Sequence, residues 1–151
     1  MNFQRLEDQI CEDEGFRSEP YVCPAGVATQ GYGTTRILTE PVTMDNPPIS
    51  EQTARELMRS DLYRACIDAQ ELFERFDEMD AERQEVLVNM CYNLGRRGLS
   101  RFKRLRKAAE ALDYRMMAWE MRDSRWFRQV GQRAERLYQT MYGKPKYKVD
   151  Q

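Results

Sequence analysis

The stretch EGFRSEPYVCPAGVATQGYG, residues 14–33, decides the fold that we expect, because it interrupts a chain that is otherwise helical by pattern. Short pieces within it, such as PYVC and VATQGYG, alternate with Gly and Pro, which is typical of strands and tight turns. This texture continues to Pro48 and does not return later in the chain. The sequence therefore predicts one small β-bearing region, at about residues 15–49.

A helix is predicted directly before this region. Phe3, Leu6, Ile10 and Cys11 follow helical spacing, and Gly15 stands where a left-handed C-cap ends a helix. The first helix is therefore expected to end at Glu14.

A long helix is predicted directly after the region, with Ser50 as its N-cap. An apolar stripe along it consists of Ala54, Leu57, Leu62, Ala65, Cys66, Ala69, Leu72, Phe73 and Phe76. At about 1.5 Å per residue, the roughly 26 residues from this N-cap to Phe76 would span roughly 39 Å. We expect it to link two lobes.

The rest of the chain is helical by period, over residues 80–94, 101–112, 115–122 and 133–142, with breaks at Gly95, Gly98 and Gly131. The predicted fold class is α+β. It is a single two-lobed domain over residues 1–143, with a small lobe at about 15–49 and a linking helix at about 50–76. The helical lobe combines residues 1–14 with 77–143, a cleft lies between the lobes, and residues 144–151 form a frayed tail.

Composition excludes several classes of function. The 151 residues are 41% hydrophobic and 32% charged, as in one globular domain, and no apolar run approaches the roughly 20 residues of a membrane helix. The N-terminus lacks the pattern of a signal peptide, so we expect the chain to stay in the cytoplasm and to have no stable membrane insertion. The sequence has no His, which excludes catalysis by an imidazole side chain. It also has no C-x-x-C pair, so it lacks the ligand spacing typical of a zinc site. We expect no metal, no cofactor and four free thiols, at Cys11, Cys23, Cys66 and Cys91.

Charge is divided unequally along the chain. Residues 1–94 hold 8 Lys and Arg against 19 Asp and Glu, whereas residues 95–151 hold 16 against 6. A basic face of this kind favours an anionic polymer such as nucleic acid or the bacterial wall. The alternative is a solvated helical surface with internal ion pairs.

Glu14 is a candidate proton donor because of its place at the end of the first helix. An acid there faces the negative end of the helix dipole, which favours its protonated form. Glycosidic cleavage needs such a donor for the leaving oxygen. Acidic runs such as Glu12 to Glu14 are otherwise usually solvated surface.

Glu14, Cys23 and Thr29 stand in an E-x8-C-x5-T arrangement, followed by the G-x-G turn of Gly31 and Gly33. This segment resembles the catalytic segment of the bacteriophage T4-type lysozymes, glycoside hydrolase family 24. The resemblance implies a lysozyme-like form of the α+β fold. It also implies that Glu14 is the general acid, that Cys23 takes the place usually held by Asp, and that Thr29 orients the hydrolytic water.

Two further segments extend the resemblance. NMCYNLG (89–95) is similar to the family's cleft-lining helix, and SRWFRQVGQRAER (124–136) to its S-R-W segment. The resemblance implies sugar contacts by Thr35, Tyr92 and Asn93, and an arginine, Arg133, near Glu14. The chain departs from the family at Leu105 and Glu120, where Ser or Asn is frequent, and at Thr34, which replaces a His after the G-x-G turn.

Cys23 has an alternative interpretation as a small buried hydrophobe, the usual state of a free cysteine. A thiol accepts hydrogen bonds weakly and ionises near neutral pH only when its pKa is lowered. We expect Cys23 to position or polarise water rather than to act as a strong base.

The resemblance implies an endolysin, a muramidase that hydrolyses the β-1,4 bond between N-acetylmuramic acid and N-acetylglucosamine of peptidoglycan glycan strands. It would act as a monomer, without nucleic acid, from the host cytoplasm after holin-type release. The alternatives are a lytic transglycosylase on the same bond, a wall-binding module without catalysis, and a nucleic-acid-binding helical protein, which the basic C-terminal part favours.

Overall fold

The computed structural model describes residues 1–143, in two compact units. The small unit consists of residues 2–64, and the helical unit begins at residue 65. The boundary falls within α2, Glu51–Leu72. The predicted tail, residues 144–151, lies outside the described residues.

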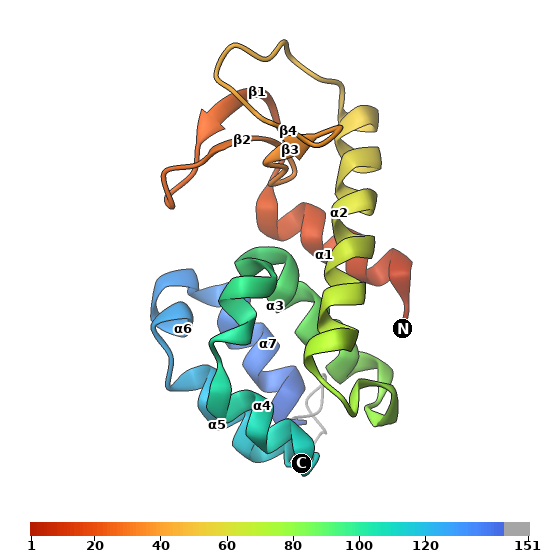
Figure 1. Ribbon diagram of the computed structural model, residues 1–151, viewed down its shortest axis with the longest axis vertical. Helices are drawn as coiled ribbons and strands as arrows, with labels where there is room; N and C mark the ends of the chain where they lie inside the picture. The colour runs from red at the N-terminus through yellow and green to blue at the C-terminus, as the bar shows by residue number, and fades with distance from the viewer. Residues whose placement is uncertain (144–151) are drawn as a thin grey trace, which may run out of the picture. The chain divides into compact units, whose positions relative to one another are not determined.

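The small unit contains one helix, two short hairpins and the first turns of α2. Its elements before α2 are α1 (Phe3–Glu14), β1 (Arg17–Val22), β2 (Ala28–Gly31), β3 (Arg36–Ile37) and β4 (Glu40–Pro41). Strands β1 and β2 pair antiparallel, with Tyr21 opposite Thr29 and a bulge between Arg17 and Tyr21. Strands β3 and β4 form a second antiparallel pair. Figure 1 shows these strands beside the first turns of α2.

Helix α1 ends where the sequence predicts. The Asn2 side chain accepts a hydrogen bond from the Arg5 amide at 3.0 Å and caps the start. Gly15 adopts φ 71°, and its amide donates to the Cys11 carbonyl at 2.9 Å. Because this turn closes the helix, Glu14 is its last residue.

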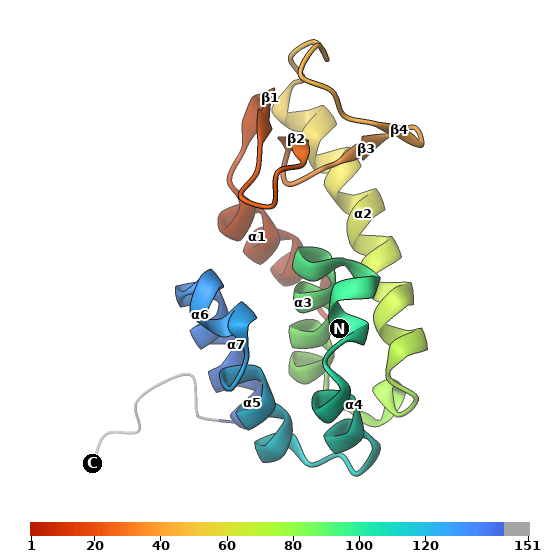
Figure 2. The same ribbon diagram turned by 60° about the vertical axis from the view of Figure 1, so that its left-hand side comes forward.

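In the helical unit, α3 is followed by short helices, the last of which packs against it. Its elements after α2 are η1 (Phe76–Glu78), α3 (Ala81–Ser100), α4 (Lys103–Glu110), α5 (Tyr114–Arg122), α6 (Arg125–Val130) and α7 (Gln132–Tyr142). Helix α5 packs against α4 and α7, as Figure 2 shows. Together with the hairpins, this helical unit confirms the predicted α+β, lysozyme-like fold class.

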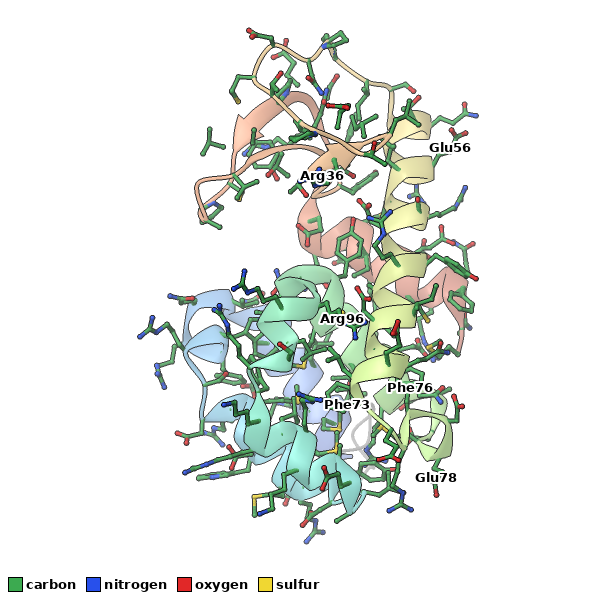
Figure 3. All side chains as sticks on the ribbon, viewed as in Figure 1. Arg36, Glu56, Phe73, Phe76, Glu78 and Arg96 are labelled. Carbon is green, nitrogen blue, oxygen red and sulfur yellow. The ribbon has the colours of Figure 1, made fainter. Side chains whose placement is uncertain are left out.

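The linking helix is shorter than predicted, ending at Leu72 and not at residue 76. Its N-terminus is confirmed, because the Ser50 hydroxyl accepts from the Thr53 amide at 3.1 Å. Phe73 and Phe76 lie beyond the helix end, but both side chains are buried (Figure 3). Their burial explains why the apolar spacing continues past Leu72. The Arg106 side chain donates to the Leu72 carbonyl at 3.3 Å, which satisfies one of the carbonyls left free there.

Two other helix predictions need correction. Gly95 leaves helical geometry at φ 74°, as expected, but helical turns resume and run through Gly98 to Ser100. The sequence pattern does not predict helix α6, although the Ser124 hydroxyl caps it by accepting from the Phe127 amide at 3.1 Å.

In the structure, α1 belongs to the same compact unit as the strands. The predicted division into lobes, with residues 1–14 in the helical lobe, stays a prediction.

Candidate functional site

Glu14 lies against the backbone of the G-x-G turn. A Cβ atom added to Gly33 would stand 2.9 Å from Glu14 Oε2 and 3.1 Å from its carboxyl carbon. Gly33 also has φ 78°, a conformation that side chains other than glycine rarely adopt. The glycine therefore gives the half-buried carboxylate its place at the end of α1.

Cys23 sits at the turn that joins β1 to β2. Its amide donates to the Val27 carbonyl at 3.0 Å, and the Gly26 amide donates to the Cys23 carbonyl at 2.8 Å. Burial raises the pKa of the Cys23 thiol, but hydrogen bonds from the backbone of Val27, the side chain of Thr29 and the backbone of Ala25 outweigh it. The net result is a pKa below the ordinary value of 9.0, which favours the thiolate.

Thr29 connects the turn to the thiol. Its side chain is only 3% exposed, and its hydroxyl donates to the Val27 carbonyl at 2.9 Å. The same hydroxyl is within hydrogen-bond reach of the Cys23 thiol. Because a hydroxyl has one proton, it serves one of these acceptors at a time, and its lone pairs stay able to accept from a water. The structure thus brings Cys23 and Thr29 together.

Thr35 lies apart from this pair, in the second hairpin. Its carbonyl accepts from the Val42 amide at 2.8 Å, and its side chain is exposed. The backbone of Thr35 therefore has a structural role, and its predicted sugar contact stays a prediction.

Tyr92, Asn93 and Arg133 belong to the helical unit, and two hydrogen bonds there were not predicted. The Trp126 indole N–H donates to Asn93 Oδ1 at 2.8 Å, and Arg133 Nε donates to Asn89 Oδ1 at 2.9 Å. Asn89 is fully buried. A buried amide needs a hydrogen-bond partner. Asn89 in the NMCYNLG segment therefore indicated a buried polar contact, which sequence analysis missed.

A pocket of about 470 Å³ opens in the helical unit beside Trp126. Its charged lining residues are Arg101, Lys103, Arg104, Arg125, Glu120 and Asp123. Its apolar wall includes Phe102, whose ring meets that of Trp126 edge-on at 6.3 Å. Leu105 and Glu120, the two departures from the family pattern, both line it. Its lining therefore carries more positive than negative side chains.

The remaining cysteines offer no comparable chemistry. All four are free of disulfides in the structure. Burial raises the pKa of Cys66 and that of Cys11, and it raises the pKa of Cys91 to about 12. Cys23 is thus the thiol whose surroundings favour ionisation.

Among residues 1–143, no group of three or more His, Cys, Asp or Glu side chains could hold a metal ion. None of the described helices combines the length and the apolar character that a membrane span requires.

The α+β fold described above is lysozyme-like, and comparisons with known proteins give its family. The family model described as phage lysozyme matches residues 11–140, so the chain belongs to the phage lysozyme family. The pre-baseplate central spike protein Gp5 of Enterobacteria phage T4 is 27% identical over 87% of this chain. The matched part is 26% of the length of Gp5. Probable T4-type lysozyme 2 of Dictyostelium discoideum is 24% identical over 87% of this chain and 90% of its own length.

Proposed function

We propose that this chain is a muramidase, which hydrolyses the β-1,4 bond between N-acetylmuramic acid and N-acetylglucosamine in bacterial peptidoglycan. Membership of the phage lysozyme family points to a peptidoglycan-lytic, lysozyme-type enzyme. The observation that carries the finer proposal is local to the small unit. There Glu14 is held against Gly33, and a thiol with a lowered pKa lies beside Thr29.

Glu14 is the proposed general acid. It gives its proton to the glycosidic oxygen as the bond from that oxygen to the anomeric carbon breaks. The oxygen of a water then bonds to the anomeric carbon, and its surplus proton passes to solvent. Glu14 regains a proton from solvent, so the protein ends the cycle unchanged.

Cys23 and Thr29 are the proposed holders of that water. The sulfur of Cys23 accepts a hydrogen bond from the water, and Thr29 accepts a second one while it donates to the Val27 carbonyl. Two acceptors fix the direction of the water's lone pairs. Orientation of this kind is what a single displacement needs.

The helical unit supplies the proposed contacts with the polymer. The pocket beside Trp126 has four cationic lining residues against two acidic ones, which fits the carboxylates of a wall peptide. Tyr92 and Asn93 are the proposed sugar contacts, and Arg133 the proposed partner of Glu14. We further propose that the chain works as a monomer and reaches the wall from the host cytoplasm after holin-type release.

The test is digestion of purified peptidoglycan, followed by turbidity and by mass spectrometry of the products. Hydrolysis gives reducing muramic acid ends, and 1,6-anhydromuramic ends would identify a lytic transglycosylase instead. Binding without cleavage would indicate a wall-binding module. Steeply salt-dependent retention on DNA without any cleavage would favour a nucleic-acid-binding protein.

A further inference from the structure

Tyr21 shares the hairpin face of two proposed catalytic residues. It stands directly opposite Thr29 in the β1–β2 ladder, and opposite residues project from the same face. Cys23 follows two positions later, and its amide continues the ladder by donating to the Val27 carbonyl. A spacing of two returns a side chain to the same face of a strand. Tyr21, Cys23 and Thr29 therefore lie on one side of the hairpin.

The ring of Tyr21 is held in place by Arg17. The guanidinium carbon of Arg17 lies 4.5 Å from the ring centroid, a cation–π contact. Tyr21 is half-buried. A tyrosine in this state covers its apolar body and presents its polar tip. Within residues 1–143 the structure records no hydrogen bond of the Tyr21 hydroxyl to another residue.

The Tyr21 hydroxyl also stays protonated, so it remains a hydrogen-bond donor. Burial and the negative charge of Glu14 raise the pKa of Tyr21 above its ordinary value of 10.0, Cys23 adds to the rise, and Arg17 opposes it. The phenol therefore keeps its proton through the neutral range. A neutral phenol in this place offers a hydrogen bond and adds no charge of its own.

We propose that Tyr21 is a substrate-binding residue, whose hydroxyl donates a hydrogen bond to an oxygen of the sugar beside Glu14 and Cys23. The acceptor class is a neutral sugar oxygen, such as an acetamido carbonyl or a ring hydroxyl. Arg17 acts through Tyr21 as a positioning residue. This inference rests on the proposed function, because it needs a sugar at the hairpin face.

The test measures binding without turnover. In a Glu14→Gln background, calorimetry with a soluble tetrasaccharide of alternating N-acetylglucosamine and N-acetylmuramic acid gives the dissociation constant. Tyr21→Phe keeps the ring and removes the donor, so the constant should rise about fivefold, the usual worth of one neutral hydrogen bond. Where Glu14 is intact, kcat/KM should fall by a similar factor at every pH between about 5 and 9, because the phenol does not titrate there.

Tyr63→Phe is the matched control, since Tyr63 lies on α2 of the same unit and is 66% exposed. Tyr63→Phe should change neither the dissociation constant nor kcat/KM. Tyr21→Leu also removes the ring, so its melting temperature reports any structural role separately. A dissociation constant that Tyr21→Phe leaves unchanged, or a rate ratio that varies with pH, would overturn the inference. If the wild-type chain leaves the wall uncut, the proposed function fails instead.

Discussion

The β-bearing segment of the small unit buries mainly polar side chains, whereas the helical unit buries mainly methionine and other apolar side chains, with Glu85 and Asn89 as its buried polar residues. Thr29, Gln30 and Thr34 are almost fully buried. Gln30 Nε2 donates to the carbonyls of Ser18 at 2.9 Å and Pro47 at 2.8 Å, which ties three parts of the segment together. The buried methionines of the helical unit are Met79, Met90, Met117, Met121 and Met141.

This difference separates two kinds of substitution effect. Hydrogen bonds and close backbone approaches fix the directions of individual atoms, as a catalytic group requires. Apolar packing fixes volume and contributes most of the free energy of unfolding. Changes at the small unit's site should therefore act on rate, and changes in the helical core should act on stability.

The largest effect is expected at Glu14. Glu14→Gln keeps the size of the side chain but removes the proton, so the rate of wall cleavage should fall by about 10² to 10⁴. The melting temperature should stay near that of the wild type. A variant that clears a wall suspension at the wild-type rate would show that Glu14 is not the acid.

The counterpart in the helical unit is Met117, whose side chain is 0% exposed. Met117→Ala should lower the free energy of unfolding by about 2–5 kcal/mol, because it leaves a cavity. Measured well below the melting temperature, kcat should change little. Denaturant titration beside the rate assay checks both, and a loss of rate without a loss of stability would break the comparison.

Cys23 tests whether the small unit's site handles water. Cys23→Asp supplies an oxygen acceptor where most of the family has one, so activity should persist or rise. Cys23→Ala should lose activity, by roughly tenfold if one water contact is lost. If Cys23 were only a packing residue, Asp would destabilise the fold and Ala would cost little. Thermal melting distinguishes the outcomes, and an Ala variant as fast as the wild type contradicts the water-holding role.

Local pattern predicted the start of the site but not its close contacts. Gly15 fixed the end of α1, and the spacing from Glu14 to Thr29 indicated which residues to compare. The contact between Glu14 and Gly33 and the place of Tyr21 depend on the hairpin register, which includes a bulge. Periodicity cannot supply a bulge, because the pattern of alternation is what the bulge interrupts.

The errors in the helical unit have a similar cause. Buried Phe73 and Phe76 extend an apolar stripe whether or not the helix continues, so the stripe could not reveal the end at Leu72. Helix α6 is only six residues long, too short for a periodic signal. Its N-cap, Ser124, was the available sign.

The smallest effect is expected at Asp61, the partner of Thr34. The Thr34 hydroxyl donates to Asp61 Oδ2 at 3.1 Å. Burial raises the pKa of Asp61 above its ordinary value of 3.8, and the Thr34 hydrogen bond and the charge of Arg64 oppose this rise without cancelling it. The family commonly has His after the G-x-G turn, and a histidine would offer Asp61 a cation that Thr34 cannot.

Asp61→Asn should therefore stabilise this chain at neutral pH. A carboxyl whose pKa is raised by folding contributes stability that is fully present below the unfolded pKa, near 3.8, and that is lost as the pH rises through the folded pKa. At pH 7 the wild type holds a partly buried carboxylate, while Asn still accepts from Thr34 and carries no charge. The melting temperature of the variant should exceed that of the wild type by a few degrees at pH 7, and this advantage should vanish at or below about pH 3.8. Melting curves at several pH values check it. A variant less stable than the wild type at pH 7 would mean that Asp61 has a cationic partner stronger than Arg64, whose closest nitrogen lies 4.0 Å away.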